Sequence, residues 1–450
     1  MTDTICAIST AIGVGGIAII RVSGTESIGI VNSIFKGKDL SKVASHTINF
    51  GHIYYENEII DEVLVSVMKE PHTYTGEDVV EINVHGGIAT TNKVLEILLN
   101  SGCRLAEPGE FTKRSFLNGR KDLIEAEAVI DLINAESESA RNLSINQLSG
   151  KLSAIIKEMR KDLLKVEANI EVNIDYPEYE DIEEVDHNKI ADVLKKLSVQ
   201  MQQMIEESKN SKIIKSGIDV ALIGLPNVGK SSLLNAFLEE EKAIVTDIAG
   251  TTRDIVEGKI QLNGITLNFI DTAGIRATDN KVEQIGVEKS LEQIEKADLV
   301  IFVHPANEEI IQEEKELLEK IKTKTYIIFI NKDDLNGKKQ FELDYRNVVY
   351  GNTIKKDGLD NLKKKIIDLF SLNQIKKKDL TYISNARQLS LIKSAKDAID
   401  SAIRATSNKM PVDIIEIDLA NARKYLGEIL GETYKDELLD ELFSKFCLGK

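Results

Sequence analysis

Gly-Leu-Pro-Asn-Val-Gly-Lys-Ser, residues 224–231, is the stretch on which the fold of this chain depends. It fits the pattern G-x-x-x-x-G-K-[ST], in which glycines let successive backbone N–H groups turn toward a phosphate. In this pattern Lys230 reaches the outer phosphates, and Ser231 offers its hydroxyl to Mg²⁺. An apolar, β-branched run precedes the stretch at 218–223, and a helical pattern follows it at 232–238. The sequence therefore predicts a strand, a phosphate-binding loop and a helix.

Length, composition and net charge indicate the number of domains, the class of protein and the kind of RNA contact that the chain can make. The 450 residues suggest about two to four domains of roughly 100 to 200 residues each. Hydrophobic residues make up 42% and charged residues 29%, which is ordinary for a soluble globular protein. The net charge of −16 gives no general attraction to a polyphosphate. Any contact with RNA must therefore come from a local basic patch or from a partner.

The cysteines and the N-terminus predict a cytoplasmic protein. Cys6, Cys103 and Cys447 are odd in number and lack C-x-x-C spacing, so they indicate neither a disulfide framework nor a cysteine metal site. The apolar run 11–20 resembles a signal-peptide core, but Asp3 precedes it, no Lys or Arg does, and glycines interrupt it. We interpret it as a loop and a strand. No run approaches 18 apolar residues, so we expect no membrane span.

Residues 1–118 predict one α+β domain, because strand-like runs alternate with turns before a helical pattern at 89–101. The expected strands are 17–22, 48–55, 62–68 and 79–84. Gly13 to Gly16 also fits the G-x-x-G of a KH-type RNA clamp, although a plain turn explains it as well. His85-Gly86-Gly87 resembles an esterase oxyanion loop, but the chain has no G-x-S-x-G nucleophile elbow.

Helical patterns on both sides of the phosphate-binding loop predict a helical bundle with an insertion. Apolar residues recur at three- and four-residue spacing from Leu123 onward, and again after the lysine run 376–378. We therefore assign 119–215 and 373–450 to one bundle and 216–372 to an inserted nucleotide domain. The acidic segment 175–186 is either a solvated loop between helices or a set of carboxylates for a divalent metal.

The inserted domain predicts a Ras-like sheet. Asn263-Gly264 is a two-residue hairpin signal, which places one antiparallel strand at the edge of an otherwise parallel sheet. The expected strands are 218–224, 259–262, 266–271, 297–304, 325–330 and 346–350.

Motifs further along the chain predict that the bound nucleotide is GTP. Asp271-Thr272-Ala273-Gly274 ends a strand, where the carboxylate can hold a Mg²⁺ water and the glycine N–H the γ-phosphate. In Asn331-Lys332-Asp333-Asp334, the carboxylate of Asp334 can accept both N1–H and N2–H₂ of guanine, donors that adenine does not offer. The segment 246–254 is a polar switch I, in which Thr252 would complete the Mg²⁺ shell. Together the motifs assign to the nucleotide Asn227, Val228, Gly229, Lys230, Ser231, Ser232, Thr246, Asp247, Ile248, Ala249, Gly250, Thr251, Thr252, Asp271, Thr272, Ala273, Gly274, Asn331, Lys332 and Asp334.

The motifs do not identify the group that orients the attacking water or the cation that offsets charge during hydrolysis. Ile275 follows Gly274, where a Ras-type enzyme has the glutamine that orients water. Arg253 and Arg276 are possible arginine fingers, although an exposed arginine near a switch more often contacts phosphate or solvent.

Four blocks of sequence resemble the bacterial MnmE (TrmE) family of tRNA modification GTPases over essentially the whole chain. They are the phosphate-binding loop with Asn227, the switch Thr-Asp-Ile-Ala-Gly-Thr-Thr-Arg-Asp at 246–254, Glu-Pro-Gly-Glu-Phe-Thr-Lys-Arg at 107–114 followed by Phe-Leu-Asn at 116–118, and the ending Phe-Cys-Leu-Gly-Lys at 446–450. The loop is common to such GTPases, whereas the N-terminal block and the ending are not.

The resemblance implies a K⁺-stimulated GTPase that acts as a homodimer. In the family, K⁺ takes the position of an arginine finger, and the matching ligands here are Asn227, Thr246, the backbone of Ile248, and Thr251. Water orientation falls to Glu283, which with Lys230 completes the expected catalytic set. The nucleotide domains of the dimer are expected to meet across the switches.

The resemblance also implies a one-carbon donor, 5-formyl- or methylene-tetrahydrofolate, in a dimer-forming N-terminal domain. Its ligands map to Arg21, Glu81, Arg120 and Lys450. A cation can pair with the folate glutamate tail and a carboxylate can accept from a pterin N–H. The alternative is that Arg21 and Glu81 are simply charged ends of strands. Cys447 stands where a prenylation box would have it, but Gly449 and Lys450 do not fit that signal, and the resemblance places Cys447 at a modification site.

The expected activity is the addition, with an FAD-dependent partner of the MnmG type, of an aminomethyl-type (carboxymethylaminomethyl) group to C5 of the wobble uridine of tRNA. One departure concerns the last guanine motif, which is Ser-Ala-like in the family and Asn352-Thr353-Ile354 here, so its base contacts stay open. The alternatives are a ribosome-assembly GTPase, which should carry a basic RNA-binding module, and a dynamin-like GTPase, which should carry a membrane-binding segment.

Overall fold

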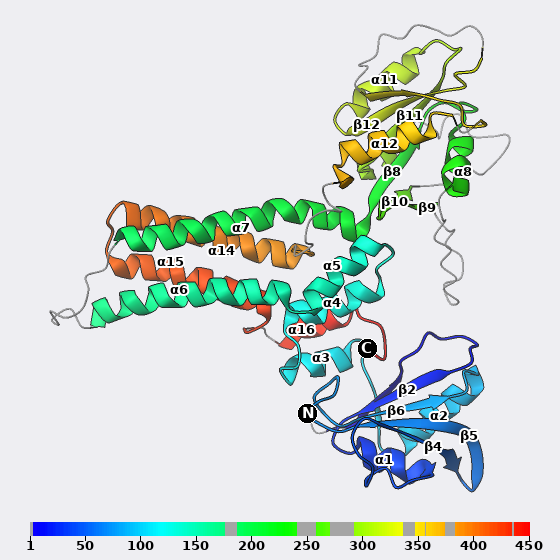
Figure 1. Cartoon of the computed structure of the whole chain (residues 1–450), viewed down its shortest axis with the longest axis vertical. Coiled ribbons are helices and arrows are strands. Elements are labelled where there is room, and N and C mark those ends of the chain that lie inside the picture. The colour runs from blue at the N-terminus through cyan, green and yellow to red at the C-terminus, as the bar shows by residue number, and fades with distance from the viewer. Residues whose placement is uncertain are drawn as a thin grey trace.

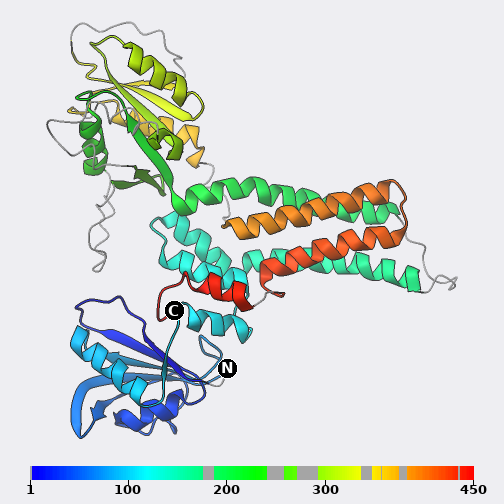
Figure 2. The same ribbon diagram turned by 180° about the vertical axis from the view of Figure 1, so that it is seen from behind.

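The computed structural model of the chain describes residues 3–175, 187–240, 258–270, 292–335, 347–355, 357–373, 383–433 and 436–450. Figure 1 shows a sheet-containing part at each end of the long axis, with helices between them. The N-terminal sheet lies at one end, and the part that carries the phosphate-binding loop lies at the other. Seen from behind in Figure 2, the C-terminus lies beside the N-terminal part.

The N-terminal part is a seven-stranded sheet with the order β3-β4-β5-β6-β2-β1-β7. Only the pair β1·β7 is parallel. Alternate residues of the central strands, such as Ile20, Val22, Val80 and Ile82, are buried in its core. The strands are β1 (Ile5–Ile8), β2 (Ala18–Ser23), β3 (Phe35–Lys36), β4 (Thr47–Tyr55), β5 (Glu58–Met68), β6 (Val79–Val84) and β7 (Arg104–Leu105), and the helices are α1 (Ser27–Ile34), α2 (Ile88–Asn100) and α3 (Glu110–Leu117).

The long helices form one bundle from two distant parts of the chain. Their buried residues, among them Leu163, Leu194, Ile399 and Leu419, share a single core. The predicted bundle is therefore confirmed. The helices that contribute to this core are α4 (Leu123–Ile133), α6 (Lys151–Asp175), α7 (His187–Ser216), α14 (Ala386–Ser407) and α15 (Val412–Leu430). Beside them, α5 (Glu138–Leu148) packs into the core of the inserted part, and α16 (Asp436–Phe443) packs against α4 in a small separate core.

The part inserted between α7 and α14 has the predicted mixed sheet, with the order β13-β12-β11-β8-β10-β9. All pairs are parallel except β9·β10. Asn263 and Gly264 have φ angles of 54° and 82°, as a two-residue hairpin turn requires. The elements are β8 (Ile218–Ile223), β9 (Lys259–Leu262), β10 (Ile265–Phe269), β11 (Leu299–Pro305), β12 (Thr325–Asn331), β13 (Val348–Tyr350), α8 (Lys230–Glu240), α11 (Gln312–Ile321) and α12 (Leu359–Leu369).

Direct contacts join the inserted part to the helices. Lys259 Nζ on β9 lies 2.8 Å from Glu136 Oε1 in the α4–α5 connection, and Gln261 Nε2 donates to the Glu136 carbonyl at 2.6 Å. Ala140 and Leu143 of α5 are buried in the same core as β8 and β10. These contacts fix the position of the nucleotide-binding part on the bundle.

The predicted boundaries were wrong in a few places. Helix α7 extends to Ser216, the first residue assigned to the nucleotide domain, because Ile214 packs into the core of the inserted part. The strand expected from 297 begins at Leu299, because the Ala297 N–H still donates to the Gln293 carbonyl in a helical turn. The helices α1 and α3 were not predicted.

Among the described residues, no helix combines the length and the apolar character that crossing a bilayer requires. The acidic segment around residues 176–186 lies outside the described residues.

Candidate functional site

Glycines give the phosphate-binding loop a shape that other residues would not allow. Gly224 and Gly229 have φ angles of 150° and 106°. A Cβ atom at Gly224 would lie 2.3 Å from the carbonyl oxygen of Val303, and one at Gly229 would lie 2.1 Å from Asn331 Nδ2. Because strand β11 and the Asn331 side chain pass so close, only glycine fits at these two positions.

Lys230, the first residue of α8, has its ammonium inside the loop. Nζ donates to the carbonyl oxygens of Gly224 and Leu225, both at 2.7 Å. Burial lowers the pKa of this lysine to about 8. Phosphate oxygens are stronger acceptors for these protons than neutral carbonyls, which makes the loop a site for a polyphosphate. Ser231 and Ser232 follow in the first turn of α8 and are exposed.

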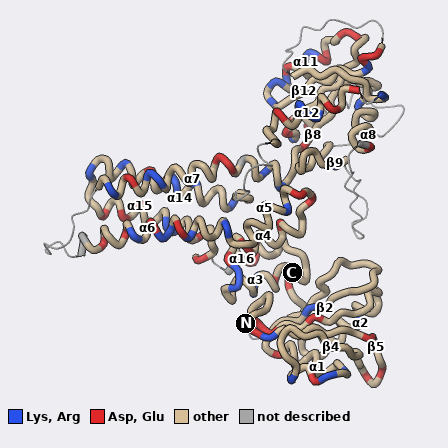
Figure 3. The backbone as a smooth tube through the Cα atoms, in the orientation of Figure 1, with Lys and Arg blue, Asp and Glu red and all other residues tan. Residues whose placement is uncertain are grey.

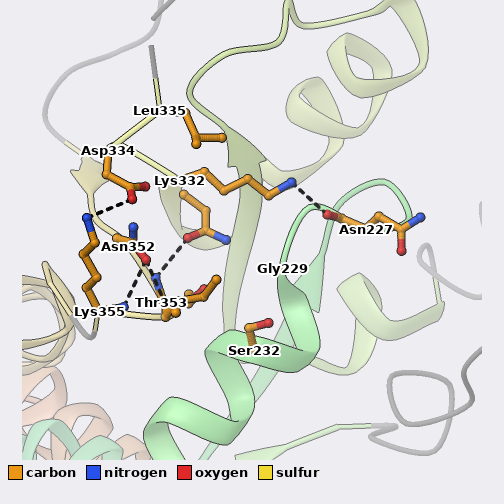
Figure 4. Close-up of a pocket in the computed structure, with 11 residues that line it drawn as sticks. Asn227, Gly229, Ser232, Lys332, Asp334, Leu335, Asn352, Thr353 and Lys355 are labelled. Carbon is orange, nitrogen blue, oxygen red and sulfur yellow. Dashed lines mark hydrogen bonds and ion pairs between the residues drawn. The ribbon is translucent and has the colours of Figure 1, made fainter.

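Asn331 ties the phosphate-binding loop to the base-binding loops. Its Nδ2 donates to the Val228 carbonyl at 2.8 Å, and its Oδ1 accepts from the Thr353 N–H at 3.2 Å. Lys332 extends over the loop, where its Nζ donates to the Asn227 carbonyl at 3.2 Å (Figure 4). The first two residues of the predicted Asn-Lys-Asp-Asp motif therefore hold the two ends of the site together.

A cavity of about 250 Å³ lies between these elements. It brings together six of the predicted residues, namely Asn227, Gly229, Ser232, Asn331, Lys332 and Asp334. The loop whose base contacts the sequence left open also lines the cavity, through Asn352, Thr353, Ile354 and Lys355. An ion pair with Lys355 is the main cause that lowers the pKa of Asp334. No sequence motif marks Lys355, because only the fold brings it to the carboxylate.

Several predicted residues lie outside the described residues. They are the switch I set of Thr246, Asp247, Ile248, Ala249, Gly250, Thr251 and Thr252, the motif of Asp271, Thr272, Ala273 and Gly274, the water-orienting Glu283, and the possible fingers Arg253 and Arg276. Their assignments stay predictions.

A second group of predicted residues meets at the C-terminus. Arg21 on β2 lies opposite Glu81 on β6, with 2.9 Å between Nε and Oε1 and 2.8 Å between Nη2 and Oε1. Its guanidinium also lies 5.4 Å from the ring centre of Tyr74 and 5.6 Å from that of Phe111. Arg21 is thus held by a carboxylate and by two aromatic rings.

The C-terminal residues are fixed against the N-terminal sheet. The Gly449 carbonyl accepts from Ser9 Oγ at 3.0 Å and from Arg21 Nη1 at 3.4 Å, and the Gly109 N–H donates to the Cys447 carbonyl at 3.3 Å. Cys447 is exposed, whereas burial and the charge of Arg21 lower the pKa of the half-buried Lys450. Ends of the chain 428 to 440 residues apart therefore build one site.

Arg120 lies at the border of this group. Its Nε donates to the Thr73 carbonyl at 3.2 Å, beside Tyr74, and its side chain is exposed. Lys121 Nζ lies 5.8 Å from the Tyr74 ring centre. The structure therefore pairs Arg21 directly with Glu81, brings Lys450 within electrostatic range of both, and joins Arg120 to the group only through residues 73–74. Sequence reasoning missed Ser9 and Tyr74, which have no motif of their own.

Comparisons with known proteins match nearly the whole chain. The family described as "GTP-binding protein TrmE N-terminus" matches residues 4–120, and the "MnmE helical domain" matches residues 123–447. Proteins named tRNA modification GTPase MnmE from Bacillus cytotoxicus and Bacillus anthracis are each 50% identical over 455 residues, which covers 100% of this chain and 99% of theirs. The crystal structure of the G domain of a FeoB iron transporter from T. maritima is 28% identical and covers 34% of this chain and 98% of its own, but its TM-score of 0.25 supports no argument.

Proposed function

The chain belongs to the MnmE family of tRNA modification GTPases, and from this premise we propose that it hydrolyses GTP to drive a modification of the wobble uridine in tRNA. The main support for the proposal is the match to proteins named tRNA modification GTPase MnmE over the entire length of this chain. The specific reaction would be the addition of a carboxymethylaminomethyl-type group to C5, together with an FAD-dependent partner of the MnmG type.

The geometry of the nucleotide site supports GTP as the nucleotide. Lys230 would bind the outer phosphates, and Ser231 and Thr252 would hold Mg²⁺. Asp334, at the other end of the cavity, would accept from N1–H and N2–H₂ of guanine, whereas adenine would leave that carboxylate without donors.

For hydrolysis we propose K⁺ as the cation that offsets charge on the transferred phosphoryl group. Its ligands would be Asn227, Thr246, the Ile248 backbone and Thr251, and Glu283 would orient the attacking water. Asn227 has a φ of 64°, and Figure 4 shows its side-chain amide directed away from Lys332 and the base-binding loops. A neutral amide oxygen in that position is a suitable ligand for a large monovalent cation.

Replacing K⁺ with Na⁺ is expected to lower GTP turnover by at least about ten-fold, because a cation that stabilises phosphoryl transfer is worth that much or more. The Asn227→Ala variant should lose most of the response to K⁺ while it retains affinity for GDP. The measurement is steady-state phosphate release in the two salts at equal ionic strength, with GDP binding as the control. Equal rates in the two salts would contradict the role of K⁺.

For the modification, we propose that the group formed by Arg21, Glu81, Arg120 and Lys450 binds a tetrahydrofolate, either the 5-formyl or the methylene form, which would supply the one-carbon unit. The charges of this group fit a ligand that carries both carboxylates and pterin N–H donors. Hydrogen bonds to the Gly449 and Cys447 carbonyls hold the tail, and the Lys450 ammonium interacts electrostatically with Arg21, Glu81 and the exposed Cys447. Cys447 is the proposed modification-site residue.

We further propose a cytoplasmic homodimer that binds tRNA mainly through the complex with its partner. Figure 3 shows basic and acidic residues interspersed along the long helices, and the net charge of the chain is −16. Such a surface favours RNA binding by a partner over binding by this chain alone. The proposed domains are 1–118 for folate binding and dimerisation, 119–215 and 373–450 for the bundle, and 216–372 for GTP.

A ribosome-assembly GTPase of the same superfamily is the alternative function. It would explain the nucleotide site but not the match of residues 4–120 and 123–447 to the MnmE and TrmE families.

A further inference from the structure

One ion pair on the cavity of the nucleotide site joins the motif residue Asp334 to Lys355, a lysine that belongs to no nucleotide-binding motif in the sequence. Lys355 Nζ lies 3.1 Å from Asp334 Oδ2, and both residues line the cavity. Figure 4 shows the two side chains directed toward one another from the two loops that border the base end. Asp334 is the acceptor that would distinguish guanine from adenine, so its orientation decides how well the base is recognised.

Hydrogen bonds hold the backbone around Lys355, so that its side chain starts from a fixed point facing the loop of Asp334. Asn352 Oδ1 accepts from the N–H groups of Ile354 and Lys355, at 2.9 and 3.1 Å. The Thr353 N–H donates to Asn331 Oδ1 at 3.2 Å, which ties the same loop to the strand end that carries Asp334. The Asp333 N–H donates to the Gly351 carbonyl at 3.2 Å and closes this connection from the other side.

The chemistry of a carboxylate allows Lys355 and guanine to bind at once. An ionised carboxylate has two oxygens with about four lone-pair directions, of which guanine would use two. Lys355 occupies one direction on Oδ2 and leaves others for N1–H and N2–H₂. The same contact with Lys355 is the main cause that lowers the pKa of Asp334 below its ordinary value.

We propose that Lys355 is a specificity-determining residue that acts through Asp334, by holding the carboxylate toward the base end of the cavity before guanine binds. This inference rests on the proposed function, because it needs a guanine nucleotide in the cavity. Lys355 is a positioning residue, and the base contact itself is made by Asp334.

The test measures the Kd of GDP for the full-length chain by fluorescence titration with a labelled GDP. Lys355→Gln should raise the Kd about two- to five-fold, within the range expected for a largely exposed charge pair. Lys355→Arg should restore the wild-type value, because a guanidinium also pairs with a carboxylate. Lys364→Gln is the matched control, because Lys364 is an exposed lysine of α12 and its removal changes the net charge equally.

A double-mutant cycle separates this role from a general structural one. Asp334→Asn should weaken GDP binding and favour xanthosine diphosphate, whose O2 can accept from the new amide. In that background Lys355→Gln should change neither Kd by more than about two-fold, because the carboxylate is gone. The inference would be overturned if Lys355→Gln matched Lys364→Gln, or if its effect persisted in Asp334→Asn. Failure of the wild-type chain to bind GDP would instead contradict the proposed function.

Discussion

The Gly449→Ala variant is expected to lose wobble-uridine modification while its GTP turnover stays within about two-fold of the wild type. Gly449 has a φ of 85°, and a Cβ atom there would lie 2.2 Å from the Ile8 carbonyl oxygen. No rotation of a methyl group relieves a contact with backbone, so the tail must move away from β1. It would then lose the hydrogen bonds that the Gly449 carbonyl accepts from Ser9 and Arg21.

The loss should be specific, because the tail lies where the helices meet the N-terminal part, whereas the phosphate-binding loop lies in the inserted part at one end of the long axis (Figure 1). The measurement is nucleoside mass spectrometry of tRNA from cells that carry only the variant, next to phosphate release by the purified chain. Gly13→Ala is the matched control, because a Cβ atom there would meet nothing within 4 Å. Normal modification by Gly449→Ala would show that the docked tail has no role in the reaction.

The Lys230→Ala variant is expected to lower GTP turnover by about 100-fold or more, since the ammonium would stabilise charge on the phosphates during transfer. Nucleotide affinity should fall as well, because the Gly224 and Leu225 carbonyls are left facing the phosphates without a cation between them. Single-turnover hydrolysis and GDP titration measure the two effects. Lys320→Ala, which removes an exposed lysine of α11, should change neither.

Because of the lowered pKa of Lys230, we also expect the affinity for GDP to depend on pH. The pKa is about 8 in the described structure, and bound phosphates would raise it, so nucleotide binding takes up a proton once the pH exceeds about 8. Affinity for GDP should therefore be nearly constant below pH 8 and fall by up to about ten-fold per unit above it. A flat profile between about pH 7 and 9.5 would contradict a buried ammonium that meets the phosphates.

The sequence predicted the elements that local patterns define. The phosphate-binding loop, the hairpin at Asn263-Gly264 and the strand β6 follow from residue types over a few positions, and the structure has all three. The end of α7 could not be predicted from its own pattern, because Ile214 is buried by the core of another part of the chain. The helix α3 was missed for a related reason. Its eight residues are mostly polar, and they are fixed by Arg114, which is 1% exposed and pairs with Asp3, Glu77 and Glu110.

The residues of the candidate sites also fall into those that local motifs predict and those that only the fold brings together. Motifs located Lys230, Asn331 and Asp334, because each motif is local in sequence. The resemblance to a family located Arg21, Glu81 and Lys450, but the hydrogen bonds that join them pass through Ser9 and the Gly449 backbone, which no local pattern marks. Lys355 was missed because its partner Asp334 lies in a different loop.

The central claim is that this chain modifies the wobble uridine of tRNA, and nucleoside mass spectrometry of tRNA from a strain without its gene tests that claim most directly. We expect the C5-modified wobble uridine to disappear, its precursor to accumulate, and the wild-type gene to restore the modification while Lys230→Ala does not. Intact modification in the deletion strain would contradict the proposed function.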